Sequence, residues 1–210
     1  MDVERRKRQN LASPRQDPRG VTPSIRNFAL AIDSQRQRLE RVPVLKGSRR
    51  DLIDLSVALD DAEVAAIAIE VDDPQAELPR LQEAARSISA PVLRTDLLLE
   101  EFQIYESRAA GADAVLLRAG SVPFEILARM AQAAKGTHMA ACIACASAEE
   151  IARVAPLQPA VIAVAPALAA AKMPPRTLVL ALSWVPGVKA DAALDETIDS
   201  AEAFRATLET

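Results

Sequence analysis

Apolar residues gather in eight short runs along this chain, and most of the runs are separated by segments with helical spacing. The runs lie at about residues 41–46, 64–71, 91–95, 114–118, 138–145, 160–165, 177–184 and 189–194. Short, continuous apolar runs are typical of strands that are buried on both faces of a parallel sheet. Strands that alternate with helices predict an α/β protein.

The clearest strand–helix–strand unit spans residues 91–117. An apolar run at 91–94 is followed by a segment with helical spacing at 100–110, which Gly111 ends, and by a second apolar run at 114–117. Two strands joined by a helix in this way pair in parallel. The unit therefore predicts a parallel sheet.

Two further helices carry start signals. Asp73 and Pro74 are suited to the N-cap and first position of one helix, and Ser147 with Glu150 forms a capping box for another. A helix is also expected within residues 23–40, ahead of the first strand. After the sixth and seventh strands, in contrast, Pro174-Pro175 and Pro186-Gly187 leave room for little more than a turn.

At residues 91–117 the chain resembles the indole-3-glycerol-phosphate synthases of tryptophan biosynthesis. It reads PVLRTDLLLEEFQIYESRAAGADAVLL, and the family pattern is close to P-V-L-R-K-D-F-I-(I/L)-D-x-Y-Q-I-Y-E-A-R-x-x-G-A-D-A-V-L-L. The resemblance implies a (β/α)8 TIM-barrel-like fold over about residues 24–210. Such barrels typically need about 250 residues, so we expect a reduced barrel in which helices 6 and 7 are shortened or missing.

The same resemblance shows where the chain departs from the family. The family's catalytic lysine falls on Thr95 and its substrate-packing phenylalanine on Leu97. Its catalytic glutamate falls on Ala144, and the asparagine that holds the substrate falls on Ala165. Alanine and threonine cannot transfer the protons that this chemistry requires. We therefore expect no catalytic residues.

The first strand resembles the family motif E-x-K-x-x-S-P-S in two alternative alignments. If Ser48 is the first serine of this motif, Pro43 replaces the glutamate and Leu45 replaces the lysine. Sliding the alignment by one residue instead places Lys46 in the lysine's role. Both alignments remain open.

The phosphate-binding end of the family is also altered. Ser183 stands in the serine's place after the seventh strand, but the glycine at the eighth strand is replaced by Leu194 or Asp195. Glycines there would let backbone N–H groups approach an anion, and an aspartate would repel one.

Cationic and hydroxyl side chains at the strand ends are the remaining candidates for ligand binding. Arg118 follows the fourth strand, where it could hold an anionic ligand or form an ion pair with Glu70 or Asp96; the ion pair is favoured because carboxylates at strand ends need partners. The candidate ligand-binding residues are Lys46, Ser48, Arg94, Arg118 and Ser183.

Composition limits the other classes of function. The net charge is −4, which gives no case for wholesale nucleic-acid binding. Cys142 and Cys145 lie three apart on a predicted strand, where they point to opposite faces, and the chain has one histidine. We therefore expect buried thiols, with no metal site and no cofactor. No membrane-length apolar run or secretory signal is seen, so a cytoplasmic protein is expected.

Residues 1–23 are basic and carry almost no core-forming side chains, which predicts a disordered tail. Such an arm could touch nucleic acid or an acidic partner, although a solvated tail without a partner is favoured. The leading hypothesis is a catalytically inactive relative that binds a partner protein or a small anionic ligand. One alternative is a synthase with displaced catalytic residues, and another is a regulatory module whose arm contacts nucleic acid. Missing helices would expose strands six to eight to self-association or a partner.

Overall fold

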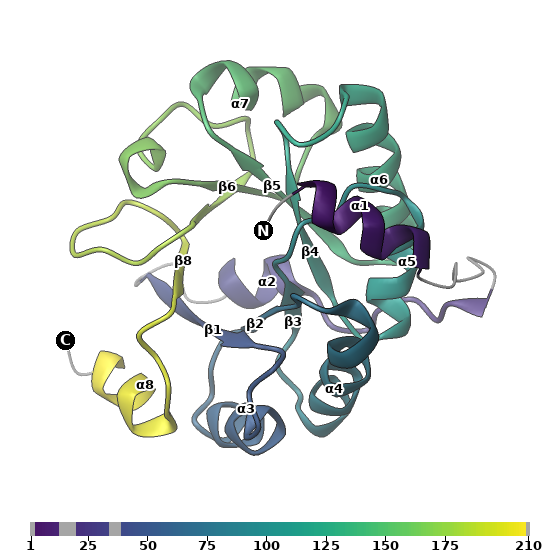
Figure 1. Cartoon of the computed structure of the whole chain (residues 1–210). Coiled ribbons are helices and arrows are strands. Elements are labelled where there is room, and N and C mark those ends of the chain that lie inside the picture. Colours follow the sequence, from purple (N-terminus) through teal and green to yellow (C-terminus); the bar gives the residue numbers. More distant parts are fainter. Residues whose placement is uncertain (1–2, 13–19, 34–38, 209–210) are drawn as a thin grey trace.

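Eight parallel strands form a closed barrel in chain order, with β8 paired to β1 (Figure 1). The structure is a computed structural model that describes residues 3–12, 20–33 and 39–208. The expected (β/α)8 fold class is confirmed. The strands are β1 (Glu40–Lys46), β2 (Ile67–Glu70), β3 (Val92–Arg94), β4 (Ala114–Arg118), β5 (Ala140–Cys145), β6 (Val161–Val164), β7 (Leu178–Ala181) and β8 (Ala192–Asp195).

Helices surround most of the barrel and begin where the sequence signals place them. The Asp73 carboxylate accepts from the N–H of Gln75 at 3.1 Å, and the Ser147 hydroxyl accepts from the N–H of Glu150 at 3.3 Å. The helices that follow the strands are α3 (Leu52–Asp61), α4 (Pro74–Ser87), α5 (Phe102–Ala109), α6 (Phe124–Gly136), α7 (Ala148–Val154) and α8 (Ala201–Leu208).

The outer wall is thin beside β6 and β7. Only a single 3₁₀ turn, η3 (Pro166–Leu168), follows β6, and the described chain has no helix between β7 and β8. The expected shortening of helices 6 and 7 is confirmed. As a consequence Val179, which points outward from β7, is only partly buried, whereas the outward Ile162 of β6 is fully buried.

Side chains alternate between the barrel interior and the layer under the helices. Ala68, Leu116 and Ala163 belong to the interior cluster. Cys142 points inward and Cys145 outward, which confirms the prediction that they face opposite sides. Both thiols are free and buried, and burial raises the pKa of each, to about 11 for Cys145.

A short helix, α2 (Phe28–Asp33), closes the N-terminal end of the barrel (Figure 1). Phe28 and Ile32 are fully buried there, within the interior cluster. The Arg26 guanidinium pairs with Asp113 at 2.8 Å and donates to backbone carbonyls of the segments that precede β3 and β4. The helix expected within residues 23–40 is therefore shorter than predicted, because the segment around Arg26 is held by these bonds; residues 34–38 lie outside the described part.

The disordered tail expected over residues 1–23 needs correction. Residues 3–12 form a helix, α1 (Val3–Ala12), that lies across the C-terminal end of the barrel (Figure 1). It is anchored by the buried Arg6, whose guanidinium pairs with Asp96 at 2.8 Å. A scarcity of apolar residues did not prevent docking because a buried ion pair provides the contact. Residues 13–19 lie outside the described part.

None of the helices in the described ranges is long and apolar enough to cross a membrane.

Candidate functional site

The candidate site is the mouth of the barrel, at the C-terminal ends of the strands. Inward and outward positions alternate, so the inward residue at each strand end lies two positions beyond an interior residue. Val44, Ala68, Leu93, Leu116, Cys142 and Ala163 are interior. The corresponding mouth positions on β1 to β6 are Lys46, Glu70, Thr95, Arg118, Ala144 and Ala165.

An ion pair occupies the mouth between the first two strands. Lys46 and Glu70 are directly opposite in the β1–β2 register, and the Lys46 ammonium bonds to the Glu70 carboxylate. This hydrogen bond raises the pKa of Lys46, with further support from the charges of Asp72 and Glu196, and desolvation opposes the shift. Lys46 is therefore a firmly protonated cation at neutral pH.

The register also bears on the two alignments of the first strand. Leu45 is 1% exposed and packs in the outer layer with Leu52 and Ile67. Lys46, and not Leu45, is the residue that faces the mouth. The alignment shifted by one residue therefore has the better geometry.

Arg118 is the second cation at the mouth. It lies opposite Ala144 in the β4–β5 register, and it is exposed. The ion pair expected with Glu70 or Asp96 is not formed, because Glu70 bonds to Lys46 and Asp96 bonds to Arg6 and Arg94. Within the described ranges no carboxylate pairs with Arg118. A free guanidinium of this kind is suited to an anionic group on a ligand.

Arg94 does not reach the mouth. It points outward from β3 into the layer beneath α5 and is fully buried. Its guanidinium forms two bonds to Asp96, at 2.6 and 2.9 Å, and further bonds of 3.1 Å to Glu106 and Ser107. Burial alone would lower the pKa of Arg94, but the charges of Asp96 and Glu106 outweigh it and raise the pKa. Arg94 is thus placed to hold α5 against the barrel, away from the mouth where a ligand was expected to meet it.

Arg6 is the charged residue of the site region that sequence reasoning missed. Besides its ion pair with Asp96, its guanidinium donates to the Val71 carbonyl at 2.8 Å, and Gln9 of the same helix donates to the Asp72 carbonyl at 3.0 Å. Burial lowers the pKa of Arg6, as does the nearby charge of Arg94, and Asp96 opposes them. An arginine among several in a basic segment carries no local signal that it will be buried.

The two predicted serines lie in separate loops of the mouth. Ser48 and Ser183 are both exposed, after β1 and β7 respectively. The loop after β1 is held in place: the Gly47 N–H donates to the Glu70 carbonyl at 2.8 Å, and Arg80 of α4 donates to the Gly47 carbonyl at 2.8 Å.

Asp195 occupies the end of β8. Its carboxylate accepts the Thr197 N–H at 2.9 Å and pairs with Arg41 on β1, whose guanidinium lies 3.9 Å from the ring centroid of Trp184. Leu194 points inward instead. The Thr197 N–H, which could otherwise donate to an anion, is therefore already bonded to the Asp195 carboxylate.

These features define a (β/α)8 barrel whose candidate site lies at the C-terminal mouth and is roofed on one side by α1. The family model of indole-3-glycerol phosphate synthase matches residues 3–166. The chain belongs to this family. The matched range includes α1, so the N-terminal helix belongs to the part of the chain that matches the family.

Curated relatives match parts of the chain. An indole-3-glycerol phosphate synthase of Chlorobium phaeovibrioides is 32% identical over 127 residues, which are 55% of this chain and 49% of that protein. One of Neisseria meningitidis serogroup B is 38% identical over 78 residues, 36% of this chain and 30% of that protein. The matches span about half or less of the length of these relatives.

Solved structures share the fold. A ligand-free tryptophan synthase from M. tuberculosis has a TM-score of 0.66 at 12% identity, covering 85% of this chain and 94% of that chain. A 2-keto-3-deoxy-6-phospho-gluconate aldolase from Zymomonas mobilis has a TM-score of 0.66 at 14% identity, covering 87% of this chain and 94% of that one. At these identities the likeness concerns the fold alone.

Proposed function

We propose that this chain is a catalytically inactive member of the indole-3-glycerol phosphate synthase family that acts by binding a partner protein or a small anionic ligand. The observation that carries the proposal is the set of side chains at the mouth positions of β3, β5 and β6, which are Thr95, Ala144 and Ala165. Resemblance to the family would place the acid, the base and the substrate-holding asparagine there. None of these three side chains can act as a general acid or base.

The charged groups that remain at the mouth do not replace the missing ones. Lys46 is held protonated by Glu70, and the Glu70 carboxylate is occupied by the same contact. The Asp195 carboxylate at the end of β8 is paired with Arg41, and it already accepts the Thr197 N–H that could otherwise meet a phosphate. Both features weigh against the synthase reaction and leave Arg118 as the cation that a small anionic ligand would meet.

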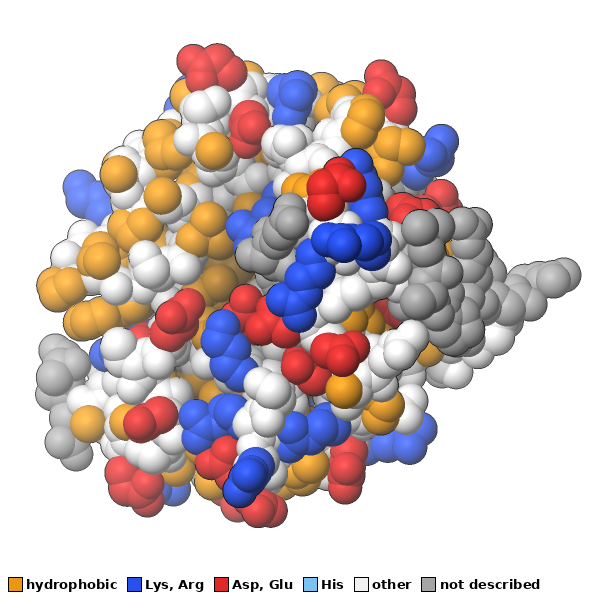
Figure 2. All heavy atoms as spheres, in the orientation of Figure 1, with side chains coloured by type: hydrophobic (Ala, Val, Ile, Leu, Met, Phe, Trp, Pro, Cys, Tyr) orange, Lys and Arg blue, Asp and Glu red, His pale blue; other side chains and the backbone are white. Residues whose placement is uncertain are grey.

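A partner protein would find an apolar surface beside the thin wall. Residues 165–190 carry three charged side chains, Lys172, Arg176 and Lys189. Figure 2 shows hydrophobic side chains gathered over the loops that follow β6 and β7. Val185, in the second loop, is 39% exposed. Exposed apolar surface of this kind marks an interaction site, and we propose that it mediates self-association or docking of a partner.

A second candidate is an indole-3-glycerol phosphate synthase with displaced catalytic groups. The observation in its favour is the Lys46–Glu70 pair, an acid and a carboxylate side by side on neighbouring strands at the mouth. In this case Lys46 would donate the proton, and Glu70 would have to serve as the base after the pair had separated.

The third hypothesis, a nucleic-acid-contacting arm, is weakened by α1. Arg6 is fully buried in its contact with Asp96 and is not available to a phosphate backbone.

The deciding experiment measures formation of indole glycerol phosphate from carboxyphenylamino-deoxyribulose phosphate by fluorescence, beside complementation of a tryptophan auxotroph. We expect no turnover above background. Robust turnover that is lost in Lys46→Met would establish the second candidate and contradict the first.

A further inference from the structure

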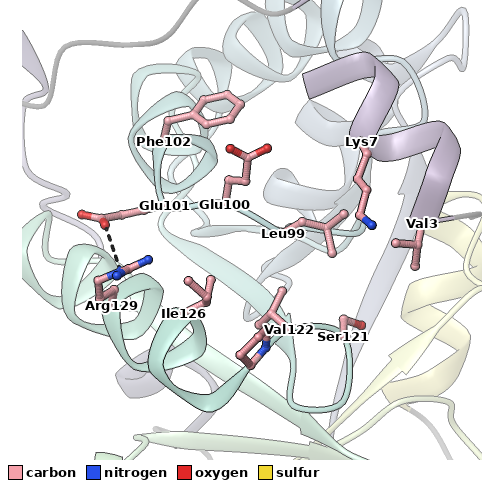
Figure 3. Close-up of a pocket in the computed structure, with 11 residues that line it drawn as sticks. Val3, Lys7, Leu99, Glu100, Glu101, Phe102, Ser121, Val122, Ile126 and Arg129 are labelled. Carbon is pink, nitrogen blue, oxygen red and sulfur yellow. Dashed lines mark ion pairs between the residues drawn. The ribbon is translucent and has the colours of Figure 1, made fainter. Parts of the chain in front are cut away.

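A pocket lies beside the barrel mouth, between α1, the loop that leads from β3 to α5, and the loop that leads from β4 to α6 (Figure 3). Its volume is about 740 Å³, which lies within the range of roughly 300–1,000 Å³ of small-molecule sites. Neither Lys46, Glu70, Thr95 nor Arg118 lines it. The pocket therefore uses none of these four side chains of the mouth.

Apolar side chains form most of its wall. Leu99 is buried, while Phe102, Val122 and Ile126 are each only partly buried and lie around the pocket. Val3 of α1, which is 37% exposed, lies across from them. These side chains expose apolar surface to water. A ligand in the pocket would cover that surface, which favours a ligand whose body is apolar.

The charges around the pocket balance. Lys7 and Arg129 contribute two cations, and Glu100 and Glu101 contribute two anions. Arg129 and Glu101 form a loose ion pair at 3.8 Å, drawn in Figure 3, and Lys7 bonds to Glu4 at 3.0 Å. No net charge of the lining favours an anion or a cation. A charged ligand would have to compete with these existing pairs for its partner.

One wall of the pocket depends on the docked position of α1. Val3 and Lys7 belong to α1, and α1 is held by the Arg6–Asp96 ion pair and the bond from Gln9 to Asp72. The opposite wall is anchored on α5 and α6. The pocket is therefore complete only when α1 lies on the barrel, so ligand binding and α1 docking support each other.

We propose that this pocket binds an uncharged, mostly apolar small molecule that is at least as large as two fused rings. Ser121 would provide a polar contact. The proposal is independent of the mouth chemistry, and it holds whether or not the chain catalyses the synthase reaction.

The test is a titration of the uniformly ¹⁵N-labelled full chain with 2-naphthol, which is uncharged at neutral pH, followed by amide NMR shifts. We expect saturable shifts at Leu99, Ser121 and Ile126, with a dissociation constant of about 1 mM or lower for a ligand of this size. The anionic analogue 2-naphthoate should bind at least about fivefold more weakly, since it would have to compete with Glu4 and Glu101 for the two cations of the lining.

Two variants test whether 2-naphthol binds in this pocket. Ile126→Lys and Val122→Lys, made separately so that one folding failure does not decide the result, should each remove the saturable shifts. Ile25→Lys is the matched control, because Ile25 is 99% exposed and does not line the pocket. It should bind 2-naphthol as the unmodified chain does. Absence of saturable shifts, shifts centred on Thr95 and Ala144, or equal affinity for 2-naphthoate would each overturn the proposal.

Discussion

The Arg6 guanidinium of the N-terminal helix lies 2.8 Å from the carboxylate of Asp96, two residues after the end of β3, and neither side chain is exposed to solvent. Asp96 also bonds to Arg94 through both carboxylate oxygens. The Asp96 carboxylate therefore links α1, which covers part of the mouth, to Arg94, which holds α5. This relationship explains how a segment with few apolar residues is kept in place.

Removal of this contact should loosen α1. Arg6→Met keeps the apolar stem but leaves Asp96 with Arg94 alone, so we expect the free energy of unfolding to fall by about 1–3 kcal/mol. Urea unfolding measures the change. Arg5→Met is the matched control, since Arg5 lies on the exposed face of the same helix, and it should stay within about 0.5 kcal/mol of the unmodified chain. Equal stability of both variants would show that α1 contributes nothing by docking.

Restoring the family's lysine should not restore its chemistry. In Thr95→Lys the new ammonium would face the mouth, but Ala144 still offers no base and the Thr197 N–H is still bonded to Asp195. Each missing acid or base typically costs about 10²–10⁴-fold in rate. We expect indole glycerol phosphate formation to remain at background. Turnover by this single variant would mean that another residue serves as the base.

Stability should respond to Lys46 at alkaline pH. The bond to Glu70 raises the pKa of Lys46 above its ordinary value of 10.5, so its stabilising contribution is present below that value and is lost as the pH rises through the folded-state pKa. Because Lys46 is 53% exposed, the contribution is at most about 1 kcal/mol. Lys46→Met should be less stable than the unmodified chain at pH 8, and the gap should close above pH ~11. A gap that stays constant with pH would contradict the ion-pair origin.

The two cysteines should resist modification in the folded chain. Burial raises the pKa of Cys145 to about 11 and raises that of Cys142 as well, so the reactive thiolate is scarce at pH 8. We expect a thiol reagent to label neither residue on the timescale on which it labels the urea-unfolded chain. Rapid labelling of the native protein at pH 8 would show that this part of the barrel opens locally.

The thin wall should support association. If the apolar surface over the loops after β6 and β7 is an interface, sedimentation should show a concentration-dependent dimer or a complex with a partner, and Val185→Lys should weaken it. Leu30→Lys is the matched control, because Leu30 is 62% exposed on α2 at the opposite end of the barrel. A clean monomer at high concentration, with no partner recovered from cells, would contradict this interface.

The local pattern of the sequence determined the eight strands, the helix starts at Asp73 and Ser147, and the opposite faces of Cys142 and Cys145. Each of these depends on residues close in the chain, whose periodicity and capping chemistry act within one element. The short side chains at Thr95 and Ala144 are likewise read directly from the sequence once the strands are counted.

Only the tertiary structure decided which charges meet. The β1–β2 register sets Lys46 opposite Glu70, and docking of α1 brings Arg6 to Asp96, so Arg118 is left without the partner expected for it. Packing of α5 against β3 places Arg94 beneath that helix. Partners far apart in the chain are chosen by register and packing, and no local pattern encodes either. For that reason the strands and helices were predictable from local patterns and the barrel from the family resemblance, whereas the charge network of the mouth and the pocket under α1 were not.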